Sequence, residues 1–287
     1  MLKIGIRSDA YFGMENYEEG MALMKAHGYD GFDYQGLASV PKSPLYKMSD
    51  EEMKAYLTKV KESAKANDLE IYQLHGALPC VDFADEEGCQ TQIKHFKTSI
   101  LGAKYLGCPK VVVHPFMPYL DRGGLIVEKE IALNIRLFKQ LAPFAEEYGV
   151  TVCIENVAVP NEVALSYLGN IKKVLDEVNS KYIKCCLDIG HFEALRRDVY
   201  EDICSLGDGL AALHVHDSAF GQDRHNLPFQ GLVDWDGFTR GLKQVGFDGV
   251  MSLETQIDGR TPEPMRTQMQ KALAGIARYL AEQASNE

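Results

Sequence analysis

The sequence predicts a (β/α)8 barrel, an α/β fold, in a single domain that spans residues 1–287. A chain of 287 residues is long for one ordinary domain but suits this barrel, which typically needs about 250 residues. Eight short apolar segments alternate with eight segments whose apolar residues recur at helical spacing. An open doubly wound sheet also alternates strand and helix. No Gly-rich phosphate loop follows the first apolar segment, so the barrel is favoured.

The expected strands are short runs of β-branched and aliphatic residues, each bounded by a turn signal. Apolar side chains at successive positions are typical of strands that are buried on both faces of a parallel sheet. In chain order the strands are Lys3–Ile6, Gly31–Tyr34, Ile71–His75, Val111–His114, Thr151–Glu155, Lys184–Asp188, Leu210–His216 and Val250–Glu254.

The expected helices lie between and after these strands and have recognisable end signals. Ser49 and the acids that follow it form an N-terminal cap, and Gly28 and Gly107 each follow the end of a helix. The helices are Tyr17–His27, Ser49–Ala66, Thr91–Leu106, Glu128–Tyr148, Ile171–Asn179, Val199–Leu206, Trp235–Val245 and Pro264–Glu282. The one long irregular stretch is expected between His216 and Trp235, where a loop over the barrel mouth tends to carry function.

Composition and charge argue against several classes of protein. Hydrophobic residues make up 46% and charged residues 25%, enough for a sizeable core. The formal net charge is −11 and no basic stretch interrupts it, which argues against a nucleic-acid partner. There is no charged leader and no run of about 18 apolar residues, so we expect a cytoplasmic protein without a membrane partner. The seven cysteines have no repeated spacing, which favours free thiols.

The third to the eighth expected strands each end in a residue that can bind a metal or move a proton. These residues are His75, His114, Glu155, Asp188, His214 and Glu254. Active sites of (β/α)8 barrels form at this end of the strands. Glu155 and Glu254 close hydrophobic strands, where burying a carboxylate costs several kcal/mol unless a positive charge faces it. We therefore expect a bound divalent cation: manganese, zinc, cobalt, iron or magnesium.

Structural roles for these polar residues are alternatives that the sequence leaves open. A lone histidine at a strand end is more often a hydrogen-bonded structural residue than a ligand. A glutamate at a strand end could pair with Arg7 or Arg224. Asp188 could cap a helix together with His191, after a tight turn that Gly190 permits.

The sequence predicts different roles for the individual histidines. His214 and His216 point to the same side of their strand, because side chains alternate with a period of two, and one of them should be the ligand. The residues alone do not decide between the two. His27, near a helix end, and His95, on a helix, are expected to be packing or surface residues.

The order and spacing of these motifs resemble the xylose-isomerase-like barrels, a family of sugar isomerases, sugar 3-epimerases, inosose dehydratases and apurinic endonucleases. The resemblance covers the whole chain. The motifs that carry it are Ile-Glu155-Asn156, Leu-Asp188-Ile-Gly-His191, His214-Val-His216-Asp217, Asp223-Arg-His225-Asn-Leu-Pro and Gly-Phe-Asp-Gly-Val-Met-Ser-Leu-Glu254.

The resemblance implies one divalent metal ion, bound by Glu155, Asp188, His214 and Glu254. His214 is chosen over His216 because in the family an acid follows the ligand histidine three residues later, as Asp217 does here. The implied activity is isomerisation or epimerisation of a sugar or sugar-like small molecule through a metal-stabilised enediolate, with proton transfer between Glu155 and Glu254. Substrate binding is assigned to His191, Arg224, His75 and His114, and a possible second metal site to Asp223 and His225. A homo-oligomer is also expected, because related barrels often form dimers or tetramers.

Three other functions remain open. A lyase would dehydrate a cyclitol, or cleave a modified sugar, from the same enolate. A multi-zinc phosphodiesterase, similar to the apurinic endonucleases, would use the additional histidines at the strand ends. Docking on DNA requires a basic surface, however, and the net charge is −11. A barrel without activity would serve as a sugar-binding or partner subunit.

One loop departs from the family pattern. Family members commonly carry Pro-Gly-x-Gly where this chain has Pro228-Phe229-Gln230-Gly231. Phe229 replaces a glycine, so we expect a different loop path that brings an aromatic face into the pocket. With Tyr11, Phe12 and Phe116 also near strand ends, the pocket is expected to accept something more apolar than a bare sugar.

Overall fold

The computed structural model of the chain describes residues 1–79, 85–117, 126–157, 163–193, 198–219 and 222–285. One sheet consists of β1 (Lys3–Arg7), β2 (Gly31–Tyr34), β3 (Glu70–His75), β4 (Lys110–Val113), β5 (Thr151–Glu155), β6 (Ile183–Asp188), β7 (Leu210–His214) and β10 (Val250–Leu253). A second, two-stranded sheet consists of β8 (Asp217–Ala219) and β9 (Gln222–Asn226).

The larger sheet is a closed barrel of parallel strands in the order β10-β1-β2-β3-β4-β5-β6-β7. Its two end strands meet at Val215, the residue after β7. Val215 donates its N–H to the carbonyl of Ser252 on β10 at 2.8 Å, and its own carbonyl accepts the N–H of Glu254 at 2.9 Å. The predicted (β/α)8 barrel is confirmed, and the predicted strands lie within about two residues of the observed ones.

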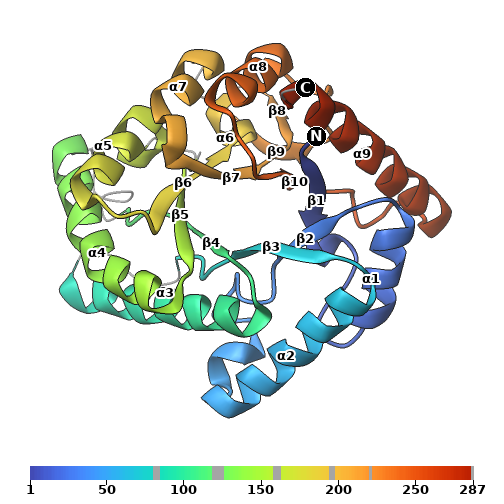
Figure 1. Cartoon of the computed structure of the whole chain (residues 1–287), viewed down its shortest axis with the longest axis horizontal. Coiled ribbons are helices and arrows are strands. Elements are labelled where there is room, and N and C mark those ends of the chain that lie inside the picture. Colours follow the sequence, from blue (N-terminus) through green and yellow to red (C-terminus); the bar gives the residue numbers. More distant parts are fainter. Residues whose placement is uncertain (80–84, 118–125, 158–162, 194–197, 220–221, 286–287) are drawn as a thin grey trace.

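The helices form a ring around the barrel (Figure 1). They are α1 (Tyr17–Ala26), α2 (Asp50–Ala66), α3 (Glu86–Leu106), α4 (Val127–Tyr148), α5 (Leu168–Val178), α6 (Ile189–Glu193), α7 (Val199–Leu206), α8 (Trp235–Val245) and α9 (Glu263–Ala284). The predicted cap at Ser49 is present: its hydroxyl accepts the N–H of Glu52, whose carboxylate accepts the N–H of Ser49. No helix in the described ranges has the length and apolar character needed to cross a membrane.

Two features of the chain differ from the sequence-based expectation. The stretch between His216 and Trp235 is not wholly irregular, because it contains the antiparallel pair of β8 and β9. This hairpin is held against the strand ends, since the carbonyl of His225 accepts the N–H of Gln256 at 3.0 Å. The short helix α6 follows β6 directly. Each feature brings polar residues back toward the mouth of the barrel.

The interior of the barrel is filled by one large ring set among small residues. Tyr72 on β3 donates its hydroxyl to the Oγ of Ser252 on β10, at 2.9 Å, and its ring packs against the backbone of Gly5 on β1. The other side of the interior is occupied by a buried cluster of Val112, Cys153, Cys186 and Ala212. Each cysteine in the described part of the chain is free, as predicted.

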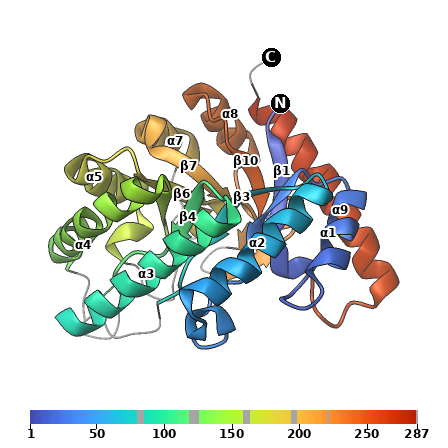
Figure 2. The same cartoon turned by 60° about the horizontal axis from the view of Figure 1, so that its bottom comes forward.

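The two ends of the barrel differ in the residues that they carry. The start of β1 and the end of α9 lie together at the end where the strands begin (Figure 2), and the N–H of Leu2 donates to the Oγ of Ser285 at 2.9 Å. At the other end, where the strands finish, the polar residues predicted from the sequence come together. The polar residues therefore place the candidate functional site at this second end.

A side chain at position 5 is expected to disturb the barrel interior. A methyl group on Gly5 would overlap the ring of Tyr72, so Gly5→Ala should destabilise the protein by about 1–3 kcal/mol. Gly275→Ala is the matched control, because Gly275 is exposed in α9 with open space around it, and it should be neutral or stabilise by about 0.5–1 kcal/mol. Urea denaturation measures both. Equal stability of the two variants would contradict this account of the interior.

Candidate metal centre

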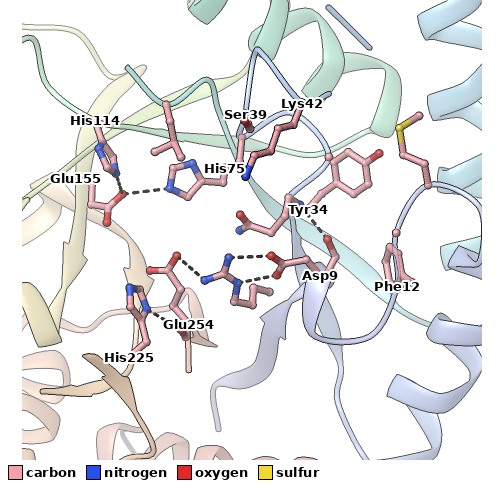
Figure 3. A pocket seen from close by; sticks show the side chains of 18 of the residues that line it. Asp9, Phe12, Tyr34, Ser39, Lys42, His75, His114, Glu155, His225 and Glu254 are labelled. Carbon is pink, nitrogen blue, oxygen red and sulfur yellow. Dashed lines mark hydrogen bonds and ion pairs between the residues drawn. The ribbon is translucent and has the colours of Figure 1, made fainter. Parts of the chain in front are cut away.

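A cavity of about 530 Å³ opens where the strands end. One wall comes from the segments after β1 and β2 and includes Asp9, Phe12, Ser39 and Lys42 (Figure 3). The facing wall carries side chains from the ends of β3, β4, β5 and β10, namely His75, His114, Glu155 and Glu254. Cavities of this size and position hold small-molecule ligands in (β/α)8 barrels.

The four residues predicted to bind one metal ion converge at this face. One possible ligand atom from each of Glu155, Asp188, His214 and Glu254 lies within 4.8 Å of the others. His214 Nδ1 is 3.2 Å from Glu155 Oε1 and 3.2 Å from Glu254 Oε2. All four side chains are buried. Residues 26 or more positions apart in the chain thus meet because four strands end at the same rim.

Three carboxylates and one imidazole in this arrangement fit a divalent cation. Like charges repel at these separations, and a buried carboxylate without a counter-charge costs several kcal/mol. Arg7 does not supply that charge in full, because it is 3.5 Å from Glu254 but makes contacts of 2.6 and 2.8 Å with Asp9. Glu155 Oε2 and His214 Nδ1 are buried without a hydrogen-bond partner among the described residues. Mixed oxygen and nitrogen donors of this kind suit zinc and other divalent transition metals.

Several histidines surround Glu155 and interact with its carboxylate electrostatically. Glu155 Oε2 lies 3.6 Å from His75 Nε2 and 3.4 Å from His114 Nε2 (Figure 3). Burial raises the pKa of Glu155, but the charges of His214 and His114 outweigh burial and hold this pKa well below its ordinary value. Burial lowers the pKa of His214, but Glu254 and Glu155 outweigh it and hold this pKa well above its ordinary value. A cation in this cluster would therefore compete with protons.

A second cluster lies beside the first. His191, His216, Asp223 and His225 each offer a possible ligand atom within 4.8 Å of the others. Asp223 Oδ2 is 3.2 Å from His191 Nε2, and Asp223 Oδ1 is 3.3 Å from His225 Nε2. Burial raises the pKa of Asp223, but hydrogen bonds from His191 and His225 outweigh it and hold this pKa far below its ordinary value. The structure thus joins the predicted pair Asp223 and His225 with two further histidines.

His75 and His114, predicted to contact substrate, line the cavity next to Glu155. The ring of His75 also stacks on the ring of His214, with centroids 5.5 Å apart, and His75, Glu155 and His214 form a third group of possible ligands. The position of both histidines is compatible with a substrate contact or with a metal contact. Their role stays a prediction.

The two histidines at the end of β7 belong to different clusters. His214 Nδ1 faces Glu155 and Glu254, whereas His216 Nε2 lies 3.0 Å from Asp188 Oδ1. Asp188 therefore lies between the clusters. Its other predicted role is also present, because Asp188 Oδ1 accepts the N–H of His191 at 2.7 Å and so starts α6. Capping and membership of the cluster are not mutually exclusive.

Two motif residues have structural roles. Asp217, the acid three residues after His214, accepts the N–H of Ser218 at 2.9 Å and the Nε1–H of Trp235 at 3.2 Å, so it anchors the following loop. Gly190 was expected to permit a tight turn, but its φ is not positive. The ring of His216 packs directly on Gly190, and a methyl group there would overlap that ring. The glycine supplies space, not backbone freedom.

Arg224 does not lie where the sequence-based prediction put it. Its neighbours on β9, Asp223 and His225, point into the second cluster. Side chains alternate between the two faces of a strand, so Arg224 points the other way, is exposed, and is not among the residues that line the cavity. The substrate contact expected from Arg224 is therefore not supported by its position.

The aromatic pocket expected from the sequence is not formed. Phe229 is 52% exposed, and its ring packs against Trp235 with centroids 5.4 Å apart, outside the cavity. Its φ of +71° keeps the backbone conformation that suits the glycine usual at this position, so the loop path is not redirected inward. Tyr11 packs against His27, and Phe116 is fully buried in the core. Phe12 alone of these four aromatic residues lines the cavity.

Asp33 on β2 is a residue of the site that the sequence prediction missed. Its Oδ2 lies 3.0 Å from His214 Nε2 and accepts the Nε2–H of Gln73 at 3.1 Å. Asp33 is 1% exposed, so its carboxylate is committed to the barrel interior. Because Asp33 accepts a hydrogen bond from the Nε2–H of His214, the ring presents Nδ1 to Glu155 and Glu254. An acid inside an otherwise apolar strand was the available signal in the sequence.

A family model described as "Xylose isomerase-like TIM barrel" matches residues 21–279. The chain belongs to this family. The resemblance drawn from the motifs at the strand ends is therefore confirmed for the family as a whole. Membership of the family establishes the barrel and leaves the reaction and the substrate to be inferred from the site.

The relatives differ in how much of their length is matched. An uncharacterised protein of Sinorhizobium fredii is 29% identical over 172 residues, which are 59% of this chain and 54% of that protein. The inosose isomerase of Bacillus subtilis is 25% identical over 245 residues, 83% of this chain and 84% of the isomerase. The probable endonuclease 4 of Metamycoplasma arthritidis is 25% identical over 216 residues, which are 70% of this chain and 74% of the endonuclease. The chain spans about half of the first relative and most of the other two.

Solved structures share the fold along nearly the whole chain. D-psicose 3-epimerase with D-tagatose from Clostridium cellulolyticum H10 has a TM-score of 0.80 at 16% identity, with 99% of this chain and 100% of the epimerase covered. The IOLI protein with a bound zinc atom has a TM-score of 0.73 at 19% identity, with coverage of 99% and 98%. At these identities the likeness establishes the barrel fold.

Removing the charge of Asp33 is expected to weaken metal binding. In Asp33→Asn the carboxylate that orients His214 is lost, so affinity for Zn²⁺ should fall about 10- to 100-fold. Competition with a chromophoric chelator measures this affinity. Asp30→Asn is the control, because Asp30 pairs with Arg278 at 2.9 Å before β2, at the opposite end of the barrel. Unchanged affinity in Asp33→Asn would show that His214 needs no such support.

Proposed function

We propose that the chain is a divalent-metal-dependent sugar isomerase or epimerase that moves a proton at the carbon next to a carbonyl. The observation that carries this proposal is the meeting of Glu155 and Glu254, which both line the cavity and each lie 3.2 Å from His214 Nδ1. Two carboxylates beside one metal site can serve as the base that removes a proton and the acid that returns one on another side. Membership of the family supports the same reaction class.

The proposed cofactor is one divalent metal ion held by Glu155, Asp188, His214 and Glu254, the cluster whose donor atoms lie within 4.8 Å of one another. When bound, such an ion polarises a carbonyl and a neighbouring hydroxyl and so acidifies the C–H between them. The zinc atom of the IOLI protein supports zinc as one candidate, with manganese, cobalt, iron and magnesium as the others.

The chain's own residues would divide the proton transfer between them. Glu155 and Glu254 approach the base of the cavity from β5 and from the end of β10, so they reach a substrate from different directions (Figure 3). One carboxylate removes the proton and the other returns it, which inverts a carbon, or moves it to the neighbouring carbon in an isomerisation. His114 and His214 stabilise the ionised form of Glu155, which His75 also contacts at 3.6 Å, and Arg7 lies 3.5 Å from Glu254.

The second cluster favours one further candidate function. His191, His216, Asp223 and His225 could hold an additional metal ion, and a related protein is a probable endonuclease 4. Two or more metal ions would suit phosphodiester hydrolysis. The net charge of −11 opposes docking on DNA. Cleavage of an oligonucleotide that contains an abasic site, with Zn²⁺ present, would favour this second candidate over the first.

Replacing Glu155 is expected to stop proton transfer without unfolding the protein. In Glu155→Gln the base is lost, so exchange of substrate hydrogen in heavy water should slow by a factor on the order of 100 to 10,000. The readout is deuterium at the carbon beside the carbonyl of D-fructose and other ketoses, followed by NMR. Glu146→Gln on the exposed face of α4 is the control and should keep the full rate.

The exchange experiment also separates isomerase from lyase. Deuterium incorporation with all hydroxyl groups retained supports an isomerase or epimerase. A dehydrated or cleaved product would assign the chain to the lyases. Full exchange in Glu155→Gln would remove Glu155 from the proposed mechanism.

Metal binding is expected to stabilise the folded protein. After treatment with a chelator, adding Mn²⁺ at about 100 times its Kd should raise the free energy of unfolding by about 2.7 kcal/mol, because only the folded chain assembles the cluster. Thermal denaturation measures the change. Asp188→Asn removes one of the four donors and should reduce it. A melting temperature that is insensitive to both chelator and metal would contradict the proposed cofactor.

A further inference from the structure

Lys42 brings a positive charge to the cavity that is not neutralised within the described residues. Its side chain extends from the loop after β2 into the cavity, on the side of His75 (Figure 3). No hydrogen bond or ion pair joins its ammonium group to another residue in the described ranges. Arg7 also lines the cavity, but it is held by Asp9 through contacts of 2.6 and 2.8 Å. Lys42 is therefore free to face a ligand.

The acids of the cavity wall are already committed elsewhere. Glu155 and Glu254 belong to the proposed metal cluster, and Asp223 contacts His191 at 3.2 Å. Asp9 is occupied by Arg7. These commitments leave Lys42 without an acidic side chain to neutralise it in the described wall.

The loop that presents Lys42 is fixed by hydrogen bonds at both ends. At its start the N–H of Gln35 donates to the Oγ of Ser8 at 2.9 Å, and at its end the Oγ of Ser43 donates to the carbonyl of Gly36 at 2.6 Å. Between them the carbonyl of Ala38 accepts the N–H of Leu78 at 2.7 Å. Hydrogen bonds thus support the loop on both sides of Lys42, and the Lys42 side chain itself is exposed.

Two more polar groups accompany Lys42 on this wall. Ser39 lies on the same turn, because its carbonyl accepts the N–H of Lys42 at 3.2 Å, and its side chain also lines the cavity (Figure 3). Gln35 lines the cavity as well, and its amide nitrogen is buried without a hydrogen-bond partner among the described residues. A lysine ammonium, a hydroxyl and an unpaired amide N–H can each donate a hydrogen bond to an oxyanion.

We propose that this wall, formed by Gln35, Ser39 and Lys42, binds an anionic group of the substrate, either a phosphate or a carboxylate. The inference rests on the proposed function, because it places the reacting carbons at the metal cluster and the anionic group on the wall after β2. The cavity of about 530 Å³ spans both, since Glu155, Glu254 and Lys42 all line it. Lysine is a common ligand of phosphate and carboxylate oxygens. The substrate is thus an acidic sugar and not a neutral one.

The test compares three ketoses that differ in charge at one end. Calorimetric titration of the Mn²⁺-loaded protein measures the Kd of D-fructose, D-fructose 6-phosphate and D-fructuronate. We expect at least one of the two anionic sugars to bind 10-fold or more tightly than D-fructose, as a charge-assisted hydrogen bond allows. The two anionic arms distinguish a phosphate from a carboxylate.

A pair of lysine variants assigns the preference to this wall. Lys42→Met should bring the anionic sugar to the Kd of D-fructose and leave D-fructose itself unchanged. Lys47→Met is the matched control, because Lys47 is exposed five residues later and does not line the cavity. Equal affinity for all three sugars overturns the inference. So does a preference that persists in Lys42→Met, because the anion would then be bound by the metal or by another group.

The two measurements distinguish a failure of the anion site from a failure of the proposed reaction. If an anionic sugar binds tightly through Lys42 but shows no hydrogen exchange in heavy water, the proposed anion site is supported and the proposed isomerase activity is contradicted. Hydrogen exchange on D-fructose with no preference for the anionic sugars would keep the isomerase and reject the anion site.

Discussion

The burial of three carboxylates at one rim of the barrel is the constraint on which the site depends. Glu155, Asp188 and Glu254 each close an apolar strand, where water cannot solvate them fully and where their charges repel. Six of the eight histidines of the chain gather around them, at positions 75, 114, 191, 214, 216 and 225. Such a cluster can be neutralised by protons on imidazoles or by cations. Because protons and metal cations compete to neutralise the cluster, metal binding depends on the protonation of the histidines.

Residues outside the cavity hold this charged cluster in place. Asn156 joins β5 to β6, because its Oδ1 accepts the N–H of Asp188 at 2.8 Å and its Nδ2 donates to the carbonyl of Asp188 at 2.9 Å. Asp33 orients His214 from within the barrel. The hairpin of β8 and β9 returns Asp223 and His225 to the mouth. Rigid support of this kind keeps donor atoms close without letting the like charges separate.

The structure does not support the sequence-based expectations that depended on the direction of a loop side chain. Arg224 was assigned to the substrate, but the alternation along β9 turns it away from Asp223 and His225. Phe229 was expected inside the pocket, yet it keeps a backbone conformation typical of glycine and packs on the outer face against Trp235. Both residues lie in a stretch without a strong apolar period, so nothing local in the sequence specifies which way they face.

The sequence by itself determined the barrel, the order of its elements and the kinds of side chain at the strand ends. Hydrophobic periodicity, caps and turns are local properties, and parallel strands necessarily bring their last residues to one rim. Only the tertiary structure decided that His214 and His216 serve different clusters, that Arg7 pairs with Asp9, and that Lys42 faces the cavity. These outcomes depend on distances between segments far apart in the chain, which packing sets and local pattern does not record.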